Sequence, residues 1–351
     1  MKKVSSFKKI FQWEYWPSYM FYVPILPYAV YLALKSRNPV FFSATNPAIK
    51  HSGNGAESKY KTIQLIPEEF RPKTILVKKK HSFKQTMTEI ENARIEFPLI
   101  AKPDIGFRGL LVKKIDSPEI LETYLQQYKI PIIIQEFVSY SNECGLFYYR
   151  IPGEEKGDIS SITIKKYLTV SGNGKHTLEE LIIQDERAQF YLDLMREIHG
   201  EGLKEVPENN ESVLLNVIGN HAKGTQFFNG NHLIDEKLVE SFDALNQQIE
   251  GWYYGRLDIK YDKFEDLRKG KNFKILEING IIAEPTHIYD ATNQTYLNSI
   301  RTIKDHWKMI HKIATTNHNK HGIPYAKVST FLKDIKELLN YTKKIKELTN
   351  S

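Results

Sequence analysis

Cysteine is nearly absent from this chain, and its scarcity limits the chemistry that the chain can perform. The 351 residues include a single cysteine, Cys144, so no disulfide can form within the chain. A lone cysteine is typical of a reducing compartment, and we expect a packed thiol rather than a nucleophile. Internal repeats and low-complexity tracts are also missing, and the length suits about two or three domains.

Several signatures of well-known enzymes and binding modules are missing as well. The sequence has no G-x-S-x-G elbow, no H-E-x-x-H motif and no H-R-D or D-F-G motif of a kinase. It has neither zinc-finger spacing nor an RNA-binding aromatic signature, so we expect no nucleic-acid partner. The modest net charge of +7 suits an anionic ligand such as a nucleotide, or an anionic membrane surface.

An uncharged, aromatic-rich stretch lies near the N-terminus, at residues 17–34, and follows four lysines. No small-residue cleavage site follows it, so a signal peptide is not indicated. It is barely long enough to span a bilayer, and Pro24 and Pro27 interrupt it. We favour a helix buried against the body of the protein over an interfacial helix that makes peripheral contact with anionic lipid.

The remaining pattern mixes strands and helices without regular βαβ alternation. This order predicts an α+β fold class, with a short N-terminal α/β part before an α+β body. Thr177 and Glu180 have the spacing of a capping box at a helix start. Strands are expected at 39–47, 72–79, 97–115 (a pair), 131–138, 253–262 and 272–280, and helices at 81–95, 118–128, 236–250 and 329–347, the last as a solvated surface element.

Two of the expected strands carry polar residues on one face. In "GRLDIKYD", Arg256 and Asp258 share a face, and in "FKILEIN" Glu277 and Asn279 do. If the strands are neighbours, two carboxylates and an amide form the oxygen-rich cluster that Mg²⁺ prefers, and phosphate oxygens complete the set. Arg256 would then stabilise charge on a transferred phosphoryl group. Either strand alone is explained by an ordinary half-exposed hairpin.

Two loops combine a lysine with glycines. Lys102 ends an apolar strand before Gly106 and Gly109, and Lys59 follows the glycines of the 52–61 loop. Glycines let backbone N–H groups approach phosphate, and lysine supplies a positive charge. The loops match neither a Walker A motif nor a dinucleotide fingerprint. On its own, the Lys102 loop is more simply explained as a plain hairpin, and Lys59 is ambiguous.

A buried strand, "IIIQEFV", ends in polar residues. It contains Gln135 and Glu136, ends at Val138, and Glu143 follows shortly after. Main-chain groups at such a strand end can bind an adenine edge, and a nearby carboxylate can accept hydrogen bonds from ribose hydroxyls. A surface acid in a linker explains Glu143 equally well.

The order of these motifs over residues 56–290 resembles the ATP-grasp superfamily of carboxylate–amine ligases. "ESKYK" and "FPLIAKPDIGFRG" are similar to its phosphate-binding segments, "IIIQEFV" to its adenine-binding strand, and "GRLDIKYD" with "ILEING" to its metal-binding strands. The resemblance implies two α+β subdomains that clasp ATP. The implied roles are phosphate binding by Lys59, Lys102, Gly106 and Gly109; adenosine binding by Gln135, Glu136, Val138 and Glu143; metal binding by Asp258, Glu277 and Asn279; and catalysis by Arg256 and Lys102.

The resemblance also implies a reaction. A substrate carboxylate would attack ATP to give an acyl phosphate and ADP, with two Mg²⁺ ions or Mn²⁺, and an amine would displace the phosphate while the glycine loop excludes water. The expected partners are a small carboxylate and a small amine. The implied domains are a pre-ATP-grasp-like domain at 1–75, the ATP-grasp domain at 76–310 with a subdomain junction near 138–145, and a basic helical tail at 311–351.

Two segments concern the branch of the superfamily and the substrate. "VSGNGKHTLEELI" is similar to a turn and helix of cyanophycin and glutathione synthetases, with Asn173 in a structural role. "GIIAEPTHIYD" replaces the Pro-Gly loop of D-alanine–D-alanine ligases, so it identifies no substrate. Candidate substrate residues there are Glu284, His287 and Tyr289, and Lys223 of "NHAKGTQF" is a candidate catalytic residue; a packed loop is the simpler explanation for each.

Two classes of function therefore remain open. The first is an ATP-dependent ligase that forms an amide or peptide-like bond, which the complete set of acids and amide favours. The second is an ATP-binding, membrane-associated regulatory or scaffold protein with the same fold and little catalysis. We expect a cytoplasmic location, at the inner face of the membrane if residues 17–34 are interfacial.

Overall fold

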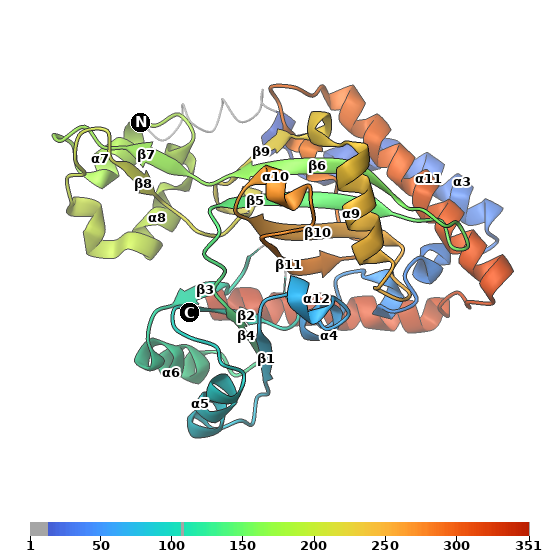
Figure 1. Ribbon diagram of the computed structural model, residues 1–351, viewed down its shortest axis with the longest axis horizontal. Helices are drawn as coiled ribbons and strands as arrows, with labels where there is room; N and C mark the ends of the chain where they lie inside the picture. Colours follow the sequence, from blue (N-terminus) through green and yellow to red (C-terminus); the bar gives the residue numbers. More distant parts are fainter. Residues whose placement is uncertain (1–12, 107–108, 351) are drawn as a thin grey trace.

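Two antiparallel sheets organise the chain, which a computed structural model describes for residues 13–106 and 109–350. Their strand orders are β1-β4-β2-β3 and β11-β10-β5-β6-β9, and a third sheet pairs β7 with β8 (Figure 1). The small sheet comprises β1 (Thr74–Val77), β2 (Leu99–Pro103), β3 (Lys113–Ile115) and β4 (Ile132–Glu136). The large sheet comprises β5 (Asn142–Tyr149), β6 (Asp158–Lys166), β9 (Gln226–Asn229), β10 (Tyr254–Tyr261) and β11 (Phe273–Asn279).

Every strand pair in the three sheets is antiparallel, which confirms the expected α+β class. Most expected strands and helices also occur close to their predicted bounds. The chain passes from the small sheet to the large one between β4 and β5, near the predicted subdomain junction at 138–145. The two subdomains therefore have separate cores, one on each sheet.

The helices that cover the sheets begin at side-chain caps. Ser82, Ser117 and Asp235 each accept a hydrogen bond from a backbone N–H in the first helical turn, which satisfies a donor that the helix leaves unpaired. The helices on the small sheet are α5 (Phe83–Asn92) and α6 (Pro118–Gln127); those on the large sheet include α9 (Glu236–Asn246) and α10 (Phe264–Leu267). Their apolar faces bury Ile90, Leu121 and Phe242 in the two cores.

A third lobe is inserted between β6 and β9. It contains β7 (Thr169–Ser171), β8 (Ser212–Leu214), α7 (Leu178–Gln184) and α8 (Leu192–His199) around its own apolar core. The predicted capping box of Thr177 and Glu180 is present at α7. Asn173 accepts hydrogen bonds from two backbone N–H groups of the preceding turn, which agrees with its expected structural role.

The N-terminal part differs from the α/β arrangement expected for it. Before β1, the described residues from 13 onward form only helices and loops, including α2 (Tyr19–Tyr22), η2 (Val23–Ile25), α3 (Leu26–Lys35) and α4 (Lys59–Ile63). The strand expected at 39–47 is instead the 3₁₀ helix η3 (Phe41–Ala44). Packing overrides its strand propensity, because Phe41 is buried in the core shared with the C-terminal helices.

The C-terminal helices are not a solvated tail. The predicted domain boundary at 310 falls inside one continuous helix, α11 (Tyr296–His321), because its buried residues on both sides pack on the body of the protein. The last helix, α12 (Val328–Asn350), buries Ile345 in the core of the small sheet, and Asp334 pairs with Lys50 and His51. It therefore ties the small sheet to the N-terminal part (Figure 1). No helix in the described ranges is both long and apolar enough to cross a bilayer.

Candidate functional site

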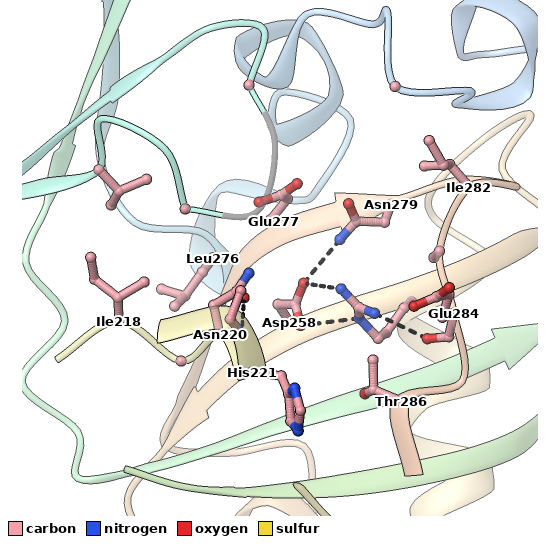
Figure 2. A pocket seen from close by; sticks show the side chains of 18 of the residues that line it. Ile218, Asn220, His221, Asp258, Leu276, Glu277, Asn279, Ile282, Glu284 and Thr286 are labelled. Atoms are coloured by element: carbon pink, nitrogen blue, oxygen red, sulfur yellow. Dashed lines mark hydrogen bonds and ion pairs between the residues drawn. The ribbon is translucent and has the colours of Figure 1, made fainter. Parts of the chain in front are cut away.

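A cavity of about 1200 Å³ lies between the two sheets. Strands of both sheets line it, together with residues of the N-terminal helices, the segment 217–222 and helix α12. Segments distant in sequence therefore enclose one space. Figure 2 shows Asp258 on β10, with Glu277 and Asn279 on the neighbouring β11 and Glu284 on the loop that follows.

Strands β10 and β11 place the predicted acids together. In their register, Asp258 lies opposite Glu277 and Arg256 lies opposite Asn279, so all four side chains point from one face of the sheet. A register shift follows Asp258, between it and Ile259. The expected pairing of the two strands is thus confirmed, while the metal-binding role remains a prediction.

Asp258 is held by donors on both carboxylate oxygens. Oδ1 accepts from Lys165 Nζ at 2.8 Å and from Arg256 Nε at 3.2 Å, and Oδ2 accepts from Arg256 Nη2 at 3.1 Å and from Asn279 Nδ2 at 2.9 Å. Burial acts to raise the pKa of Asp258, but Arg256 and Lys165 outweigh it and hold that pKa well below its usual range. Asp258 is therefore ionised at neutral pH.

Lys165 is a site residue that the sequence analysis missed. Its side chain lies on β6, is 5% exposed, and bridges Asp258 and Glu143, with Nζ 2.6 Å from Glu143 Oε1. Tyr167 donates to the other oxygen of Glu143. Gly219 lies so close that a Cβ there would meet Glu143 Oε1 at 2.4 Å. The predicted ribose acceptor is therefore buried and already hydrogen-bonded, although it lines the cavity.

The two predicted phosphate-binding lysines reach the cavity from elements other than β10 and β11. Lys59 begins α4, where Ser58 caps the helix, and its ammonium pairs with Glu277. Lys102 lies on β2 and donates to Gln135 Oε1 at 3.0 Å. Burial lowers the pKa of Lys102 to about 8, although Glu277 acts against this shift. For Glu277, burial acts to raise the pKa, but Lys59 and Lys102 outweigh it and lower it.

The glycine loop also borders the cavity. Gly106 and Gly109 line it, whereas Phe107 and Arg108 between them lie outside the described residues. Gly109 has a positive φ of +72°, and a Cβ there would lie 3.3 Å from Ile218. The positive φ favours a glycine at this position. The loop also lies close to Ile218, in the segment 217–222 that lines the same cavity.

The predicted adenosine residues lie at the edge between the subdomains. Gln135, Glu136 and Val138 line the cavity at the end of β4. Glu136 N–H donates to Lys73 O at 2.9 Å, and Val138 O accepts from Lys260 Nζ at 3.1 Å. The strand end thus joins the two sheets directly and forms part of the wall.

The candidate substrate residues divide into two groups. Glu284 and Tyr289 line the cavity, and Glu284 accepts hydrogen bonds from Tyr22 at 2.7 Å and from Tyr289 at 2.9 Å. His287 and Lys223 do not line the cavity, so their expected place in the site is not found, and their roles stay predictions. His287 lies in the 3₁₀ turn η10 (Thr286–Tyr289), which buries it, and burial lowers its pKa to about 4. Lys223 is the last residue of η8 (His221–Lys223) and directly follows the lining residues 217–222.

Lys260 and Tyr22 were not predicted either. Strand alternation does place Lys260 on the face of Arg256 and Asp258, but it was given no role in the site. Tyr22 had no such signal, because its place depends on how the N-terminal helices pack.

The donor set fits Mg²⁺. Asp258 and Glu277 offer carboxylate oxygens and Asn279 an amide, which are the hard ligands that this ion prefers. Across residues 13–106 and 109–350, no three His, Cys, Asp or Glu side chains gather as a metal site of their own. If Mg²⁺ binds here, the amide of Asn279 and the oxygens of a phosphate ligand would complete its coordination, and Lys59 would exchange Glu277 for that ligand.

Comparison with known proteins gives similarity in fold. No protein-family model and no curated protein sequence matches the chain. Similar solved structures include a bifunctional glutathione synthetase from Pasteurella multocida, with 12% identity and a TM-score of 0.37 over 71% of this chain and 36% of that one. A second is the VanG D-Ala:D-Ser ligase from Enterococcus faecalis, with 13% identity and a TM-score of 0.41 over 74% of this chain and 62% of that one. A third is a D-alanine–D-alanine ligase from Bacillus anthracis, with 13% identity and a TM-score of 0.38 over 73% of this chain and 68% of that one.

These similar structures are described as ligases or synthetases. The chain matches only 36% and 62% of the length of the first two. Likeness at 12–13% identity concerns the fold alone, so the chemistry of the site must come from this chain's own residues.

Proposed function

We propose that this protein is an ATP-dependent ligase that activates a carboxylate as an acyl phosphate and joins it to an amine. One observation carries the proposal: a cross-strand carboxylate pair, Asp258 and Glu277, meets basic side chains from other elements in one cavity. Carboxylates that bind cations and lysines that bind phosphate are the two halves of a site for a nucleotide triphosphate with Mg²⁺.

Each residue then has a role set by its position. Lys59, Lys102 and Arg256 would hold the phosphates, and Asp258, Glu277 and Asn279 would hold Mg²⁺, which would withdraw charge from the phosphate oxygens. The substrate carboxylate attacks the γ-phosphorus, the bond to ADP breaks, and an acyl phosphate forms. An amine then attacks the acyl carbon, loses a proton, and phosphate leaves. Exclusion of water from the cavity during the reaction would limit hydrolysis of the acyl phosphate.

Glu284 is our candidate for binding the amine substrate. Its two carboxylate oxygens accept hydrogen bonds from phenol groups, while Arg256 donates to its backbone carbonyl at 3.0 Å. A substrate ammonium would give this carboxylate a charged partner. The same arginine would thereby connect the amine subsite to the phosphates.

The test is nucleotide turnover in the purified protein, screened against mixtures of small carboxylates and amines with Mg²⁺. We expect release of ADP and phosphate, and loss of about a thousandfold or more in kcat for Glu277→Gln, because the variant removes a carboxylate that would hold the Mg²⁺ acting on the phosphates. Lys274→Gln, on the same strand but outside the cavity, is the matched control. Full activity of Glu277→Gln, or release of AMP and pyrophosphate, would contradict the mechanism.

One observation favours the alternative of an ATP-binding protein with little catalysis: both oxygens of Asp258 are already satisfied by donors of the chain itself. A binding protein would show a rise in melting temperature with Mg-ATP that Lys102→Met reduces, without ADP release for any substrate mixture. Substrate-dependent ADP release would exclude this alternative.

A further inference from the structure

The N-terminal helices expose an apolar surface. From residue 17 to residue 34 the chain has no charged side chain, and it runs through α2, η2 and α3 almost without interruption. One face carries large apolar side chains that are 50–72% exposed: Tyr19, Val23, Leu26, Val30, Tyr31 and Leu34. A helix that is apolar all round is normally buried, and this one is buried only on one side.

The other face fixes the orientation of this surface. Phe21, Ile25 and Leu32 are at most 4% exposed and pack on cores that include Ile303 and Ile310 of α11. Tyr296 at the start of α11 donates to Met20 O at 2.5 Å. Figure 1 shows α3 alongside α11 at the outside of the molecule. The helices can therefore offer only their outer face to a partner, so they would lie along a surface rather than enter it end-on.

Basic side chains flank the apolar face. Exposed Lys35 and Arg37 follow its C-terminal end. On α11, Lys304 lies over the ring of Tyr28 at 5.2 Å, and Lys308 is exposed one turn further along. Asp305 is an exposed acid in the same turn. The flank is positive on balance, so it is complementary to an anionic surface, and a second copy of the same face would bring like charges together.

We propose that the outer face of α2–α3 docks on an anionic lipid surface. The apolar side chains would enter the boundary between headgroups and acyl chains, the tyrosines would lie at headgroup level, and the lysines and arginine would contact lipid phosphates. Tyr22, on the inner side of the same helices, contacts Glu284 in the cavity wall. Docking would therefore bring the cavity close to the lipid surface.

The test is co-sedimentation of the full chain with vesicles of phosphatidylcholine alone or with phosphatidylglycerol. We expect binding to the anionic vesicles, and a fall of at least tenfold for Leu26→Glu/Val30→Glu, because charge replaces inserted apolar side chains. Leu332→Glu is the matched control, since Leu332 is 60% exposed against 59% for Leu26 but lies on α12. Thermal unfolding must be unchanged in all variants, which is expected for exposed positions.

The basic side chains beside the apolar face allow a second, independent test. Arg37→Gln and Lys308→Gln should each weaken binding to anionic vesicles about fivefold and leave binding to neutral vesicles unchanged. Equal vesicle binding by the wild type and Leu26→Glu/Val30→Glu would overturn the proposal. So would a concentration-dependent dimer in sedimentation velocity that Leu26→Glu/Val30→Glu dissolves, because the occupant of the face would then be a second copy of the chain.

Discussion

Replacing Lys165 by methionine should destabilise the protein strongly, although no sequence motif includes this residue. Its ammonium lies 2.6 Å from Glu143 and 2.8 Å from Asp258, and its side chain is 5% exposed. At an effective dielectric constant of about 20, the Coulomb attraction between two unit charges at this distance is about 6 kcal/mol, before the cost of desolvation. Methionine has a similar volume but leaves two buried acids short of a cation, so we expect a loss of about 3–5 kcal/mol in the free energy of unfolding.

The loss should depend on pH. Burial acts to lower the pKa of Lys165, but Asp258 and Glu143 outweigh it and raise that pKa, while the pKa of Asp258 is lowered. The wild-type pair is therefore ionised from about pH 4 to pH 10, and its contribution is complete at pH 7. In Lys165→Met, Asp258 loses one of the two cations that lower its pKa and keeps Arg256, so it takes up a proton at a higher pH than in the wild type. The difference from the wild type should therefore shrink as the pH falls.

Urea unfolding at pH 7 and at pH 4.5 measures this difference. Lys166→Met is the control, because Lys166 is exposed on the opposite face of β6 and should change stability by less than about 0.5 kcal/mol. Adding Glu143→Gln to Lys165→Met should recover part of the loss, since it removes the charge of one of the two acids that Lys165 bridged. A loss below about 1 kcal/mol at pH 7, or one that does not shrink at pH 4.5, would refute the reasoning.

Three further predictions follow from the cavity and its borders. The pKa of Lys102 is lowered to about 8, and Lys102 must be protonated to bind phosphate, so kcat/KM for ATP should fall above about pH 8. Lys102→Arg should abolish this fall. Identical pH profiles for the wild type and the variant would contradict phosphate binding by Lys102. Glu284→Gln should raise KM for the amine by about tenfold or more at unchanged KM for ATP, and a change in the ATP value instead would argue against an amine subsite. Ile345→Ala should cost about 2–5 kcal/mol in urea unfolding, against almost nothing for exposed Leu332→Ala, because Ile345 is 2% exposed in the core of the small sheet.

The central part of the site could be predicted because strand alternation is a local property. Glu277 and Asn279 share a face because they lie two residues apart in one strand. Asp258 joins them only because its strand pairs with theirs, and this pairing was the one assumption that the sequence required. Lys102 was expected at the end of a strand, where the structure places it, whereas Lys59 was expected in a glycine-containing loop and instead begins helix α4. These are the residues that the proposed nucleotide chemistry would require.

The residues that the sequence did not reveal are those whose position depends on tertiary packing. Lys165 is a lysine on an ordinary strand, and only the neighbouring β5 and β10 bring it to Glu143 and Asp258. His287 follows a promising strand, yet a single 3₁₀ turn buries it away from the cavity. Helix α12 reads as a solvated amphipathic helix, because its sequence does not show that Ile345 fills a gap over the small sheet.

The same distinction bears on the substrate. Strands β10 and β11 supply the residues expected to drive the reaction, but Tyr22, the segment 217–222 and α12 also line the cavity. These three segments come from distant parts of the chain and meet only in the folded protein. The part of the wall that would select a carboxylate and an amine is therefore assembled by tertiary packing. For this reason the sequence motifs indicate nucleotide chemistry but do not identify the two substrates, which the screen of carboxylates and amines would identify.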